Sequence, residues 1–249
     1  MKLNTLFAMF VVCATLITNV ASSLDKSIVV YYSFNDGKAT DESGNGNDGD
    51  ITKTKVVEGV AGHGKALAFD GKSWVELKAN KTLDIAEITL AAWIYKDEVF
   101  LANNGENIIS KKQSGAYTIS VSGWENHGGC GEKLETEMRI SGSYHFVCEK
   151  TALPLKKWVH VASTHDGKEV GSKAGPGKVD FKTANTYVGA EYGDAVPDNG
   201  HGQYVGEIDE AYLANRAFSE KEIQELMVST LSVEITAKLP IIWTELKSN

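Results

Sequence analysis

Three carboxylates fall within four residues of the segment GEIDEAYLANRAFSEKEI, which spans residues 206–223. Because Glu207 and Asp209 are two residues apart, a strand would direct both side chains to one face of a sheet, with Glu210 on the opposite face. Two carboxyl groups about 5–5.5 Å apart are what a retaining glycoside hydrolase needs. The segment therefore poses two alternatives, a polysaccharide-cleaving enzyme and the closing strand of a binding module.

Outside this segment, no sequence pattern pairs a nucleophile with a base. The chain lacks the G-x-S-x-G turn of serine hydrolases, the H-E-x-x-H zinc motif and the G-x-x-x-x-G-K-[ST] phosphate loop. His160 lies between apolar neighbours in WVHVA and is expected to pack in the core. An enzymatic function would thus depend on the acidic segment alone.

Two of the three cysteines, Cys130 and Cys148, lie in the body of the chain. In an oxidising compartment an isolated pair is expected to form a disulfide, which would contribute about 3 kcal/mol to stability. His127 and His145 each lie three residues before a cysteine, so a zinc site is the alternative. Neither C-x-x-C nor a tight four-ligand pattern supports that alternative.

Export is predicted from residues 1–23. Lys2 precedes an apolar stretch that ends in small residues near Ala21, which is the order of a secretory signal peptide. The apolar stretch is too short for a comfortable membrane span, and no later segment is long and apolar enough for one. We therefore expect a secreted, extracellular protein.

The net charge of the chain limits the classes of partner that it is expected to bind. The formal net charge is -8, and it becomes -9 when Lys2 is removed with the signal peptide. Nucleic acids and anionic lipids attract basic surfaces, so neither is an expected partner. Neutral glycans, calcium or cationic partners suit an acidic protein better, and solubility alone is the alternative explanation. For an exported protein we therefore expect an extracellular glycan or a cell-surface partner.

The body of the chain consists of short β-branched and aromatic runs broken by Gly, Asn and Asp, such as SIVVYYSF at 27–34. Only one helix is predicted, with Ser219 as its N-cap and Glu222 completing a capping box. These features predict one all-β domain over residues 24–230, a β-sandwich or jelly roll. Residues 231–249 form a β-prone C-terminal tail, which we interpret as an edge strand, a stalk or a sorting signal.

Several landmarks follow one another in an order that resembles a known family. They are YYSFNDG, DESGNGNDG, GVAGHGKALAFDGKSWVEL, ITLAAWIY, KKWVHVASTHDGK, NTYVGA and GEIDEAYLANRAFSEKEI. From residue 28 to about 227 the chain resembles the LamG-like branch of the concanavalin A-like lectin/glucanase superfamily. The resemblance implies a jelly roll of two antiparallel sheets, with the last strand beside the first. It also implies an extracellular binding or adhesion module, often for carbohydrate and often containing calcium.

The same resemblance bears on the acidic segment. Glucanases of the superfamily carry a strand motif E-x-D-x-x-E or E-x-D-x-E, in which the outer glutamates are catalytic. Glu207 and Asp209 match the first two positions, but Ala211 or Tyr212 occupies the third. We therefore predict a non-catalytic protein without glycosidase activity.

The candidate ligand-binding residues are Trp124, Asn126 and Tyr144. The segment GWENHGGCGEK at 123–133 surrounds Trp124 with polar and glycine residues, and Tyr144 approaches from the other end of the predicted disulfide. Aromatic faces and amide groups are what a carbohydrate site uses for stacking and hydrogen bonding. The alternatives are that Trp124 only covers the core, and that the module recognises protein.

A glycine-rich loop near residue 45 is the candidate calcium site. Its members are Asp41, Asn45, Asn47 and Asp48. Calcium prefers carboxylate and amide oxygens of this kind. The superfamily resemblance implies a structural calcium shared with an acidic residue of the last strand, which would pair Asp41 with Asp209. The alternative is that these residues only form Asx turns.

One strand of the family pattern is missing near residues 167–171. In the family, the motif W-x-H-V-A-x-T-x-D-G is followed by a strand and a hairpin return, but here HDGKEVGSKAG is about ten residues short, enough for one strand and its turn. We predict a gap or irregular loop between residues 166 and 180. An unpaired edge on the WVHVAST strand would lower stability and favour self-association.

Overall fold

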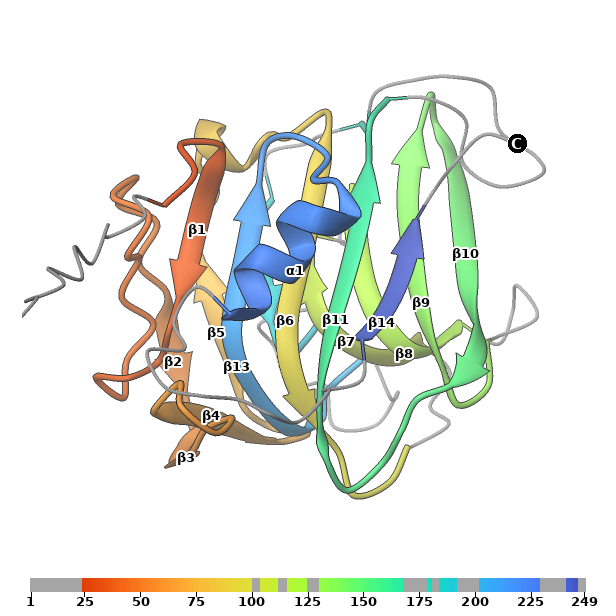
Figure 1. Ribbon diagram of the computed structural model, residues 1–249. Helices are drawn as coiled ribbons and strands as arrows, with labels where there is room; N and C mark the ends of the chain where they lie inside the picture. Colours follow the sequence, from red (N-terminus) through yellow and green to blue (C-terminus); the bar gives the residue numbers. More distant parts are fainter. Residues whose placement is uncertain are drawn as a thin grey trace, which may run out of the picture.

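The computed structural model describes residues 24–99, 104–111, 116–124, 130–167, 179–180, 184–191, 202–228 and 241–245. These residues form two seven-stranded sheets that lie face to face, with a helix on the outside of the first (Figure 1). The strands are β1 (Ile28–Tyr32), β2 (Asp50–Thr52), β3 (Lys55–Glu58), β4 (Lys65–Asp70), β5 (Trp74–Leu77), β6 (Ile88–Tyr95), β7 (Asn104–Ser110), β8 (Tyr117–Trp124), β9 (Lys133–Ile140), β10 (Ser143–Ala152), β11 (Trp158–His165), β12 (Thr186–Val188), β13 (Val205–Ala214) and β14 (Ile241–Glu245). The helices are the 3-10 turn η1 (Lys81–Leu83) and α1 (Glu220–Val228). The predicted jelly roll is confirmed.

The first sheet has the order β14-β11-β6-β13-β4-β3, with β1 as a further partner of β13. One edge of β13 is shared by two strands, because Ile208 pairs with Leu67 of β4 and Tyr212 pairs with Tyr31 of β1. The last long strand therefore lies beside the first strand, as the family resemblance implied.

The second sheet has the order β10-β9-β8-β7-β12-β5-β2, and all of its pairs are antiparallel. The hairpin of β9 and β10 forms one edge, and β5 with β2 forms the other. Alternate residues of these strands face the first sheet, as Leu134 and Met138 do in β9. Their neighbours face away from it.

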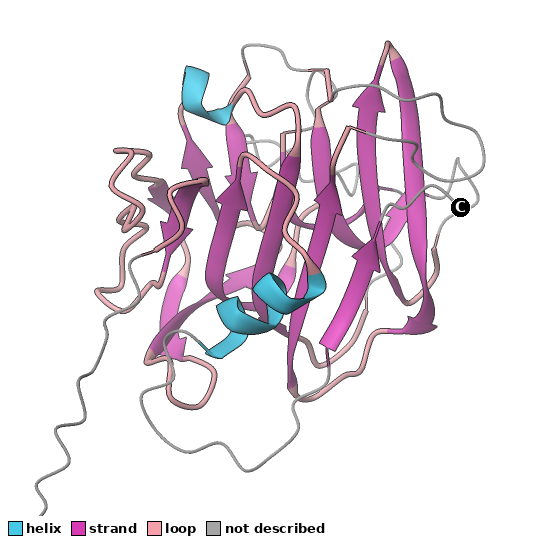
Figure 2. Cartoon of the chain, turned by 45° about the horizontal axis from the view of Figure 1, so that its top comes forward, coloured by secondary structure: helices cyan, strands magenta, loops and turns pink. Residues whose placement is uncertain are grey.

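Apolar side chains of both sheets fill the space between them and form the main core. A second apolar cluster lies outside the first sheet, on the side where α1 packs (Figure 2). It includes Ile223 and Leu226 of α1 and Tyr212 and Ala214 of β13. The three buried residues of α1, with Met227 as the third, lie on one helical face, as its sequence predicts. Among the described helices, none is long and apolar enough to cross a membrane.

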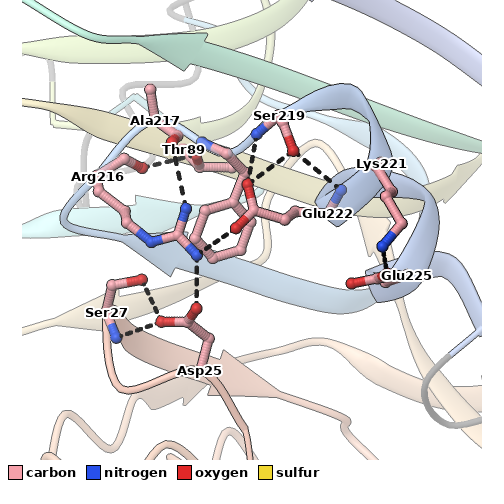
Figure 3. Close-up of polar contacts among 10 residues, drawn as sticks. Asp25, Ser27, Thr89, Arg216, Ala217, Ser219, Lys221, Glu222 and Glu225 are labelled. Carbon is pink, nitrogen blue, oxygen red and sulfur yellow. Dashed lines mark hydrogen bonds and ion pairs between the residues drawn. The ribbon is translucent and has the colours of Figure 1, made fainter.

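The predicted capping box holds the start of α1. The Ser219 backbone N–H donates to the Glu222 carboxylate at 2.7 Å, and the Glu222 N–H donates back to Ser219 Oγ at 3.4 Å (Figure 3). Arg216 donates to both Glu222 at 2.6 Å and Asp25 at 2.5 Å, so one guanidinium joins the helix to the N-terminal end of the sandwich. The hydrogen bond from Arg216 is the largest cause that lowers the pKa of the Glu222 carboxyl to about 2. The pKa of the Asp25 carboxyl is also lowered to about 2, and there the largest cause is the hydrogen bond from Ser27.

The C-terminal tail supplies a partner strand for β11, where this chain lacks a strand of the family pattern. β14 lies parallel to β11, with His160 opposite Ile241 and Thr164 opposite Glu245. The predicted unpaired edge on β11 is therefore wrong, and the edge-strand interpretation holds for residues 241–245. Most of the predicted gap, residues 168–178, lies outside the described residues. Beyond it, Val179 forms an isolated bridge with Ile140 of the second sheet.

Candidate functional site

The hairpin of β9 and β10 is closed by a disulfide. Cys130 and Cys148 are bonded, with their Cα atoms 5.5 Å apart, which confirms the sequence prediction. The bond ties the segment before β9 to the middle of β10. A Glu135 carboxylate oxygen lies 3.0 Å from Cys130 Sγ, and Glu135 is the residue directly opposite Cys148.

The zinc alternative does not gain His145 as a ligand. His145 pairs with Met138, a core residue, whereas Cys148 belongs to the alternate set of β10 residues on the other face. His127 lies outside the described residues. Among described side chains, the one group of three metal-ligating residues is the disulfide pair with Glu135.

The outer face of β10 exposes two aromatic rings. Tyr144 and Phe146 alternate along the strand on the same side as Cys148, and they are 43% and 40% exposed. Opposite Tyr144, the Arg139 guanidinium lies 5.7 Å from the centroid of the Tyr144 ring. Arg139 also lies 4.0 Å from the Asp180 carboxylate, so its charge is compensated. We call Arg139, Tyr144 and Phe146 the hairpin face.

Next to the hairpin face, on the same side of the second sheet, the strands carry polar side chains that are buried. Glu137 pairs with Phe146 on one side and with Thr118 of β8 on the other, so the three side chains form a row across the sheet. Glu137 and Thr118 are only 2% and 1% exposed. Of this row, therefore, only Phe146 at its end is open to a ligand, and Glu137 at its centre is not.

The backbone positions of two of the three predicted ligand-binding residues, Tyr144 and Trp124, lie far apart along the second sheet. Tyr144 lies opposite Arg139, and the neighbouring Met138 pairs with Tyr117 at the start of β8. Trp124 ends the same strand, so at about 3.3 Å per residue it is separated from Tyr144 by roughly 20–25 Å. Asn126 lies outside the described residues.

Phe146 and Arg139 were not predicted as site residues. Their signal in the sequence is the alternation in SYHFVC, which gives Tyr144, Phe146 and Cys148 one common face once the segment is read as a strand. Arg139 required knowledge of the hairpin register, because only the turn at Ser141 and Gly142 brings it opposite Tyr144.

Asp41 and Asp209 contact different parts of the chain. The Asp41 carboxylate accepts hydrogen bonds from the backbone N–H groups of Tyr31, Ser43 and Asn47, at 3.1, 3.0 and 2.9 Å. The Asp209 carboxylate accepts from Val60 N–H at 3.0 Å and Glu210 N–H at 2.8 Å. These bonds match the Asx-turn alternative for Asp41, and a shared calcium stays a prediction.

The expected orientation of Glu210 is wrong, because β13 carries a bulge. Asp209 pairs with Trp93 and Tyr212 with Ala91, so two residues of β13 lie opposite one residue of β6. Glu210 has a φ of 49°, in the left-handed region, which turns its side chain to the same outer side as Asp209. There its carboxylate accepts hydrogen bonds from the hydroxyls of Tyr31 at 2.8 Å and Tyr212 at 2.9 Å.

The bulge carboxylates have no access to a substrate. Asp209 and Glu210 are 0% and 1% exposed, beneath the loop that contains Val60 and His63. Burial, followed by the charge of Glu210, raises the pKa of Asp209 to about 8. Glu207 is half-buried, and burial followed by the charge of Asp97 raises the pKa of its carboxyl. The cluster thus joins β1, β13 and this loop, which is a structural role.

A polar depression lies near the edge of the second sheet that is opposite to the hairpin face. It has a volume of about 340 Å³ and lies between residues 46–48 and residues 77–81. Its floor includes Asn47, whose Oδ1 accepts hydrogen bonds from Asn80 Nδ2 at 3.1 Å and Thr82 Oγ1 at 3.0 Å. The depression presents no aromatic ring to a sugar.

With the geometry established, comparison with known proteins identifies the family. A family model for the concanavalin A-like lectin/glucanases superfamily matches residues 69–224. The chain belongs to this superfamily. In its fold, the chain is similar to binding domains of solved structure. A search of curated protein sequences finds no match.

The binding domain of Paraclostridial Mosquitocidal Protein 1 gives a TM-score of 0.62 at 14% identity, over 82% of this chain and 53% of that one. Domain 4 of AbnA, an extracellular arabinanase from Geobacillus stearothermophilus solved with arabinotriose, gives 0.56 at 18% identity, over 80% of this chain and 97% of that one. The receptor-binding domain of botulinum neurotoxin mosaic serotype C/D gives a TM-score of 0.56 at 13% identity, over 82% of this chain and 50% of that one. This superfamily member thus spans about half the length of the two toxin domains. At such identities the likeness establishes the fold.

Proposed function

We propose that this chain is a secreted, non-catalytic binding module, and that its ligand is an extracellular carbohydrate held at the hairpin face. The observation that carries the proposal is the pair of alternate aromatic side chains, Tyr144 and Phe146, exposed by 43% and 40% on an edge strand. Among described residues these are the exposed large aromatic side chains. Aromatic rings offer a sugar an apolar face, and a hydroxyl and guanidinium at their margin supply hydrogen bonds.

The surroundings of the hairpin face support a preformed site. β10 is held by the disulfide at Cys148 and by hydrogen bonds to β9, so little conformational entropy is lost when a ligand binds. The acidic net charge of -8 favours neutral over anionic glycans. Two structural neighbours were solved with arabinotriose and with SialylT, which is consistent with a carbohydrate ligand here.

Burial of the acidic cluster supports a non-catalytic role. A glycosidase needs two carboxyl groups that reach the scissile bond from opposite sides. Asp209 and Glu210 are buried and already accept hydrogen bonds from the protein, and the motif lacks a second outer glutamate. The structural neighbours described above include toxin binding domains, which agrees with this reading.

Recognition of protein is the second candidate, and a specific observation favours it. In the described part of the second sheet, β10 forms a ladder on one side only, with β9, and an edge strand of this kind is where a partner strand can add, although β14 also lies near β10. One botulinum neurotoxin binding domain was solved in complex with rat synaptotagmin II. A partner strand would use the backbone of β10, whereas a sugar would use its rings.

A glycan array of the mature protein tests the proposal. We expect binding to neutral glycans that Tyr144→Ala with Phe146→Ala weakens at least tenfold, or about 1.4 kcal/mol. The matched control is Val56→Ala on β3, which removes a 50% exposed apolar side chain from the other sheet and should leave binding unchanged. Absence of glycan binding by the folded protein would contradict the carbohydrate proposal. A protein partner whose binding survives loss of both rings would support the second candidate.

Structural calcium at Asp41 and Asp209 belongs to the same proposal. Calcium that binds only the folded protein raises the melting midpoint, and a chelator lowers it. The loop near Asp41 is rich in oxygen atoms, which supports the prediction. A midpoint that neither calcium nor chelator changes would contradict it.

A further inference from the structure

We infer that Asn80 is an N-glycosylation site. Asn80-Lys81-Thr82 is the only Asn-x-Ser/Thr sequence in the 249 residues, and its middle residue is not proline. The inference rests on the proposed export of the chain, because the transfer takes place in the secretory pathway. All three residues are exposed, at the turn where β5 ends and η1 begins.

Hydrogen bonds fix the orientation of the acceptor amide on an exposed turn. Asn80 is the N-cap of η1, and its Oδ1 accepts a hydrogen bond from Thr82 N–H at 3.2 Å. Its Nδ2 donates to Asn47 Oδ1 at 3.1 Å, and Thr82 Oγ1 donates to the same oxygen at 3.0 Å. Asn47 is itself held by Val29, whose carbonyl accepts from Asn47 Nδ2 at 2.8 Å. The sequence Asn80-Lys81-Thr82 is therefore held in place through Asn47.

The folded protein can carry a sugar at this atom without losing a contact. An amide Nδ2 has two hydrogens, and the bond to Asn47 uses one of them. Glycosylation replaces one hydrogen and leaves the other to maintain that bond. The adjoining depression of about 340 Å³ is lined by the polar loop at residues 46–48 and by residues 77–81, and it offers the first sugar a polar surface.

The reaction is a group transfer from a polyprenyl-diphosphate-linked oligosaccharide. A bond forms between Asn80 Nδ2 and the anomeric carbon of the first sugar. The carbon–oxygen bond to the diphosphate breaks, and the polyprenyl diphosphate leaves with the electron pair. The amide nitrogen gives up one proton, and no oxidant or reductant is needed.

A glycan at Asn80 would leave the hairpin face open. η1 follows β5, close to one edge of the second sheet, and β10 is the opposite edge strand (Figures 1 and 2). The polar depression is then a glycan-bearing surface and not the ligand site. Ligand binding at the hairpin face should be the same before and after removal of the glycan.

The test is the intact mass of the full chain secreted by insect or mammalian cells, measured before and after peptide N-glycosidase. The chain is produced with its own residues 1–23, and separately with an unrelated signal peptide in their place. We expect a mass excess of one N-glycan that the enzyme removes, leaving aspartate at position 80. Secreted protein with unmodified Asn80 from the unrelated signal peptide would overturn the inference.

Paired variants separate modification from folding. Asn80→Gln and Thr82→Ala should both abolish the mass excess, while Thr82→Ser retains the hydroxyl and should keep it. A mass excess that persists in Asn80→Gln would also overturn the inference. Glycosylated protein obtained only with the unrelated signal peptide would support Asn80 as the acceptor and contradict the proposed export.

Discussion

At the bulge of β13, Asp209 and Glu210 are 0% and 1% exposed, whereas on the outer face of β10, Tyr144 and Phe146 are 43% and 40% exposed. The bulge holds two carboxylates, and both are buried. The hairpin face holds no acid or base beyond the charge-compensated Arg139, and it is open. The contrast teaches that solvent access, more than residue type, separates the proposed binding site from the scaffold in this protein.

The two regions also differ in what their polar groups do. Glu210 accepts hydrogen bonds from two tyrosines whose rings stack 4.5 Å apart, so it joins β1 to β13 inside the fold. Gly59 shows how tightly the loop covers Asp209, because a Cβ there would lie 2.3 Å from Asp209 Oδ2. Substitutions at the bulge should therefore affect stability, and substitutions on the hairpin face should affect binding.

The largest expected effect is that of Glu210→Ala. Two hydrogen bonds to a buried carboxylate are lost and two tyrosine hydroxyls lose their acceptor, so we expect about 3–4 kcal/mol of destabilisation by chemical denaturation. Glu207→Ala on the same strand is the control and should cost under about 1 kcal/mol, since Glu207 is half-buried. Equal costs would remove the distinction between the buried and the accessible carboxylates.

Next in size is removal of the disulfide at the other region. Cys130→Ser with Cys148→Ser should cost about 3 kcal/mol, because the cross-link restrains the unfolded chain. The binding affinity of the folded variant should also fall, since β10 loses its tie to the segment before β9. Titration of the unreduced, denatured wild-type protein should find no free thiol among these residues. An unchanged affinity would show that the hairpin face does not need the cross-link.

Titration of the buried groups near the bulge gives a pH dependence of stability. Burial raises the pKa of Asp209 from 3.8 to about 8, so its contribution is present below pH 3.8 and is lost as the pH rises through 8. Burial lowers the pKa of His160 from 6.5 to about 3, so its contribution is present above pH 6.5 and is lost as the pH falls toward 3. The two slopes oppose each other between about pH 4 and 6.5.

Stability of the wild type should therefore be nearly level from about pH 4.5 to 6.5 and fall by about 2 kcal/mol from pH 6.5 to 8. Asp209→Asn should remove the fall above pH 6.5, and His160→Phe should reveal a decline across the level region as the pH rises. Denaturation midpoints at several pH values measure both. A wild-type curve that rises steadily from pH 6.5 to 8 would contradict the assignment.

Deletion of residues 241–249 should have a smaller effect. It would give β11 the same unpaired edge that β10 has, because β14 is the partner of β11 on that side. We expect a loss of about 1–2 kcal/mol, faster hydrogen exchange at His160–Thr164 and concentration-dependent self-association. Slow exchange at these residues in the truncated protein would show that β14 does not protect the edge.

The smallest expected effect is on the stability of the hairpin-face variant. Tyr144→Ala with Phe146→Ala should change the unfolding free energy by less than about 1 kcal/mol, because both rings are over a third exposed. The melting midpoint measured beside the binding assay checks this. A loss as large as that of Glu210→Ala would mean that the rings serve the fold.

Much of the architecture could be predicted from local patterns. Alternating apolar residues and glycine-rich turns define the strands, and Ser219 with Glu222 defines the start of α1. The Cys130–Cys148 bond follows from a pair of cysteines without other partners. These features depend on residues close in sequence or on residues with few alternatives.

The features decided by tertiary structure all depend on which strands pair and in what register. The bulge at Glu210 lies where β13 changes its partner from β4 to β1, and no residue of the segment encodes that exchange. The distance between Trp124 and Tyr144 follows from the register of β8, β9 and β10. β14 pairs with β11, a strand far from it in the sequence. Sequence periodicity specifies which faces of a strand are apolar, but only long-range hydrogen bonding decides what lies beside it.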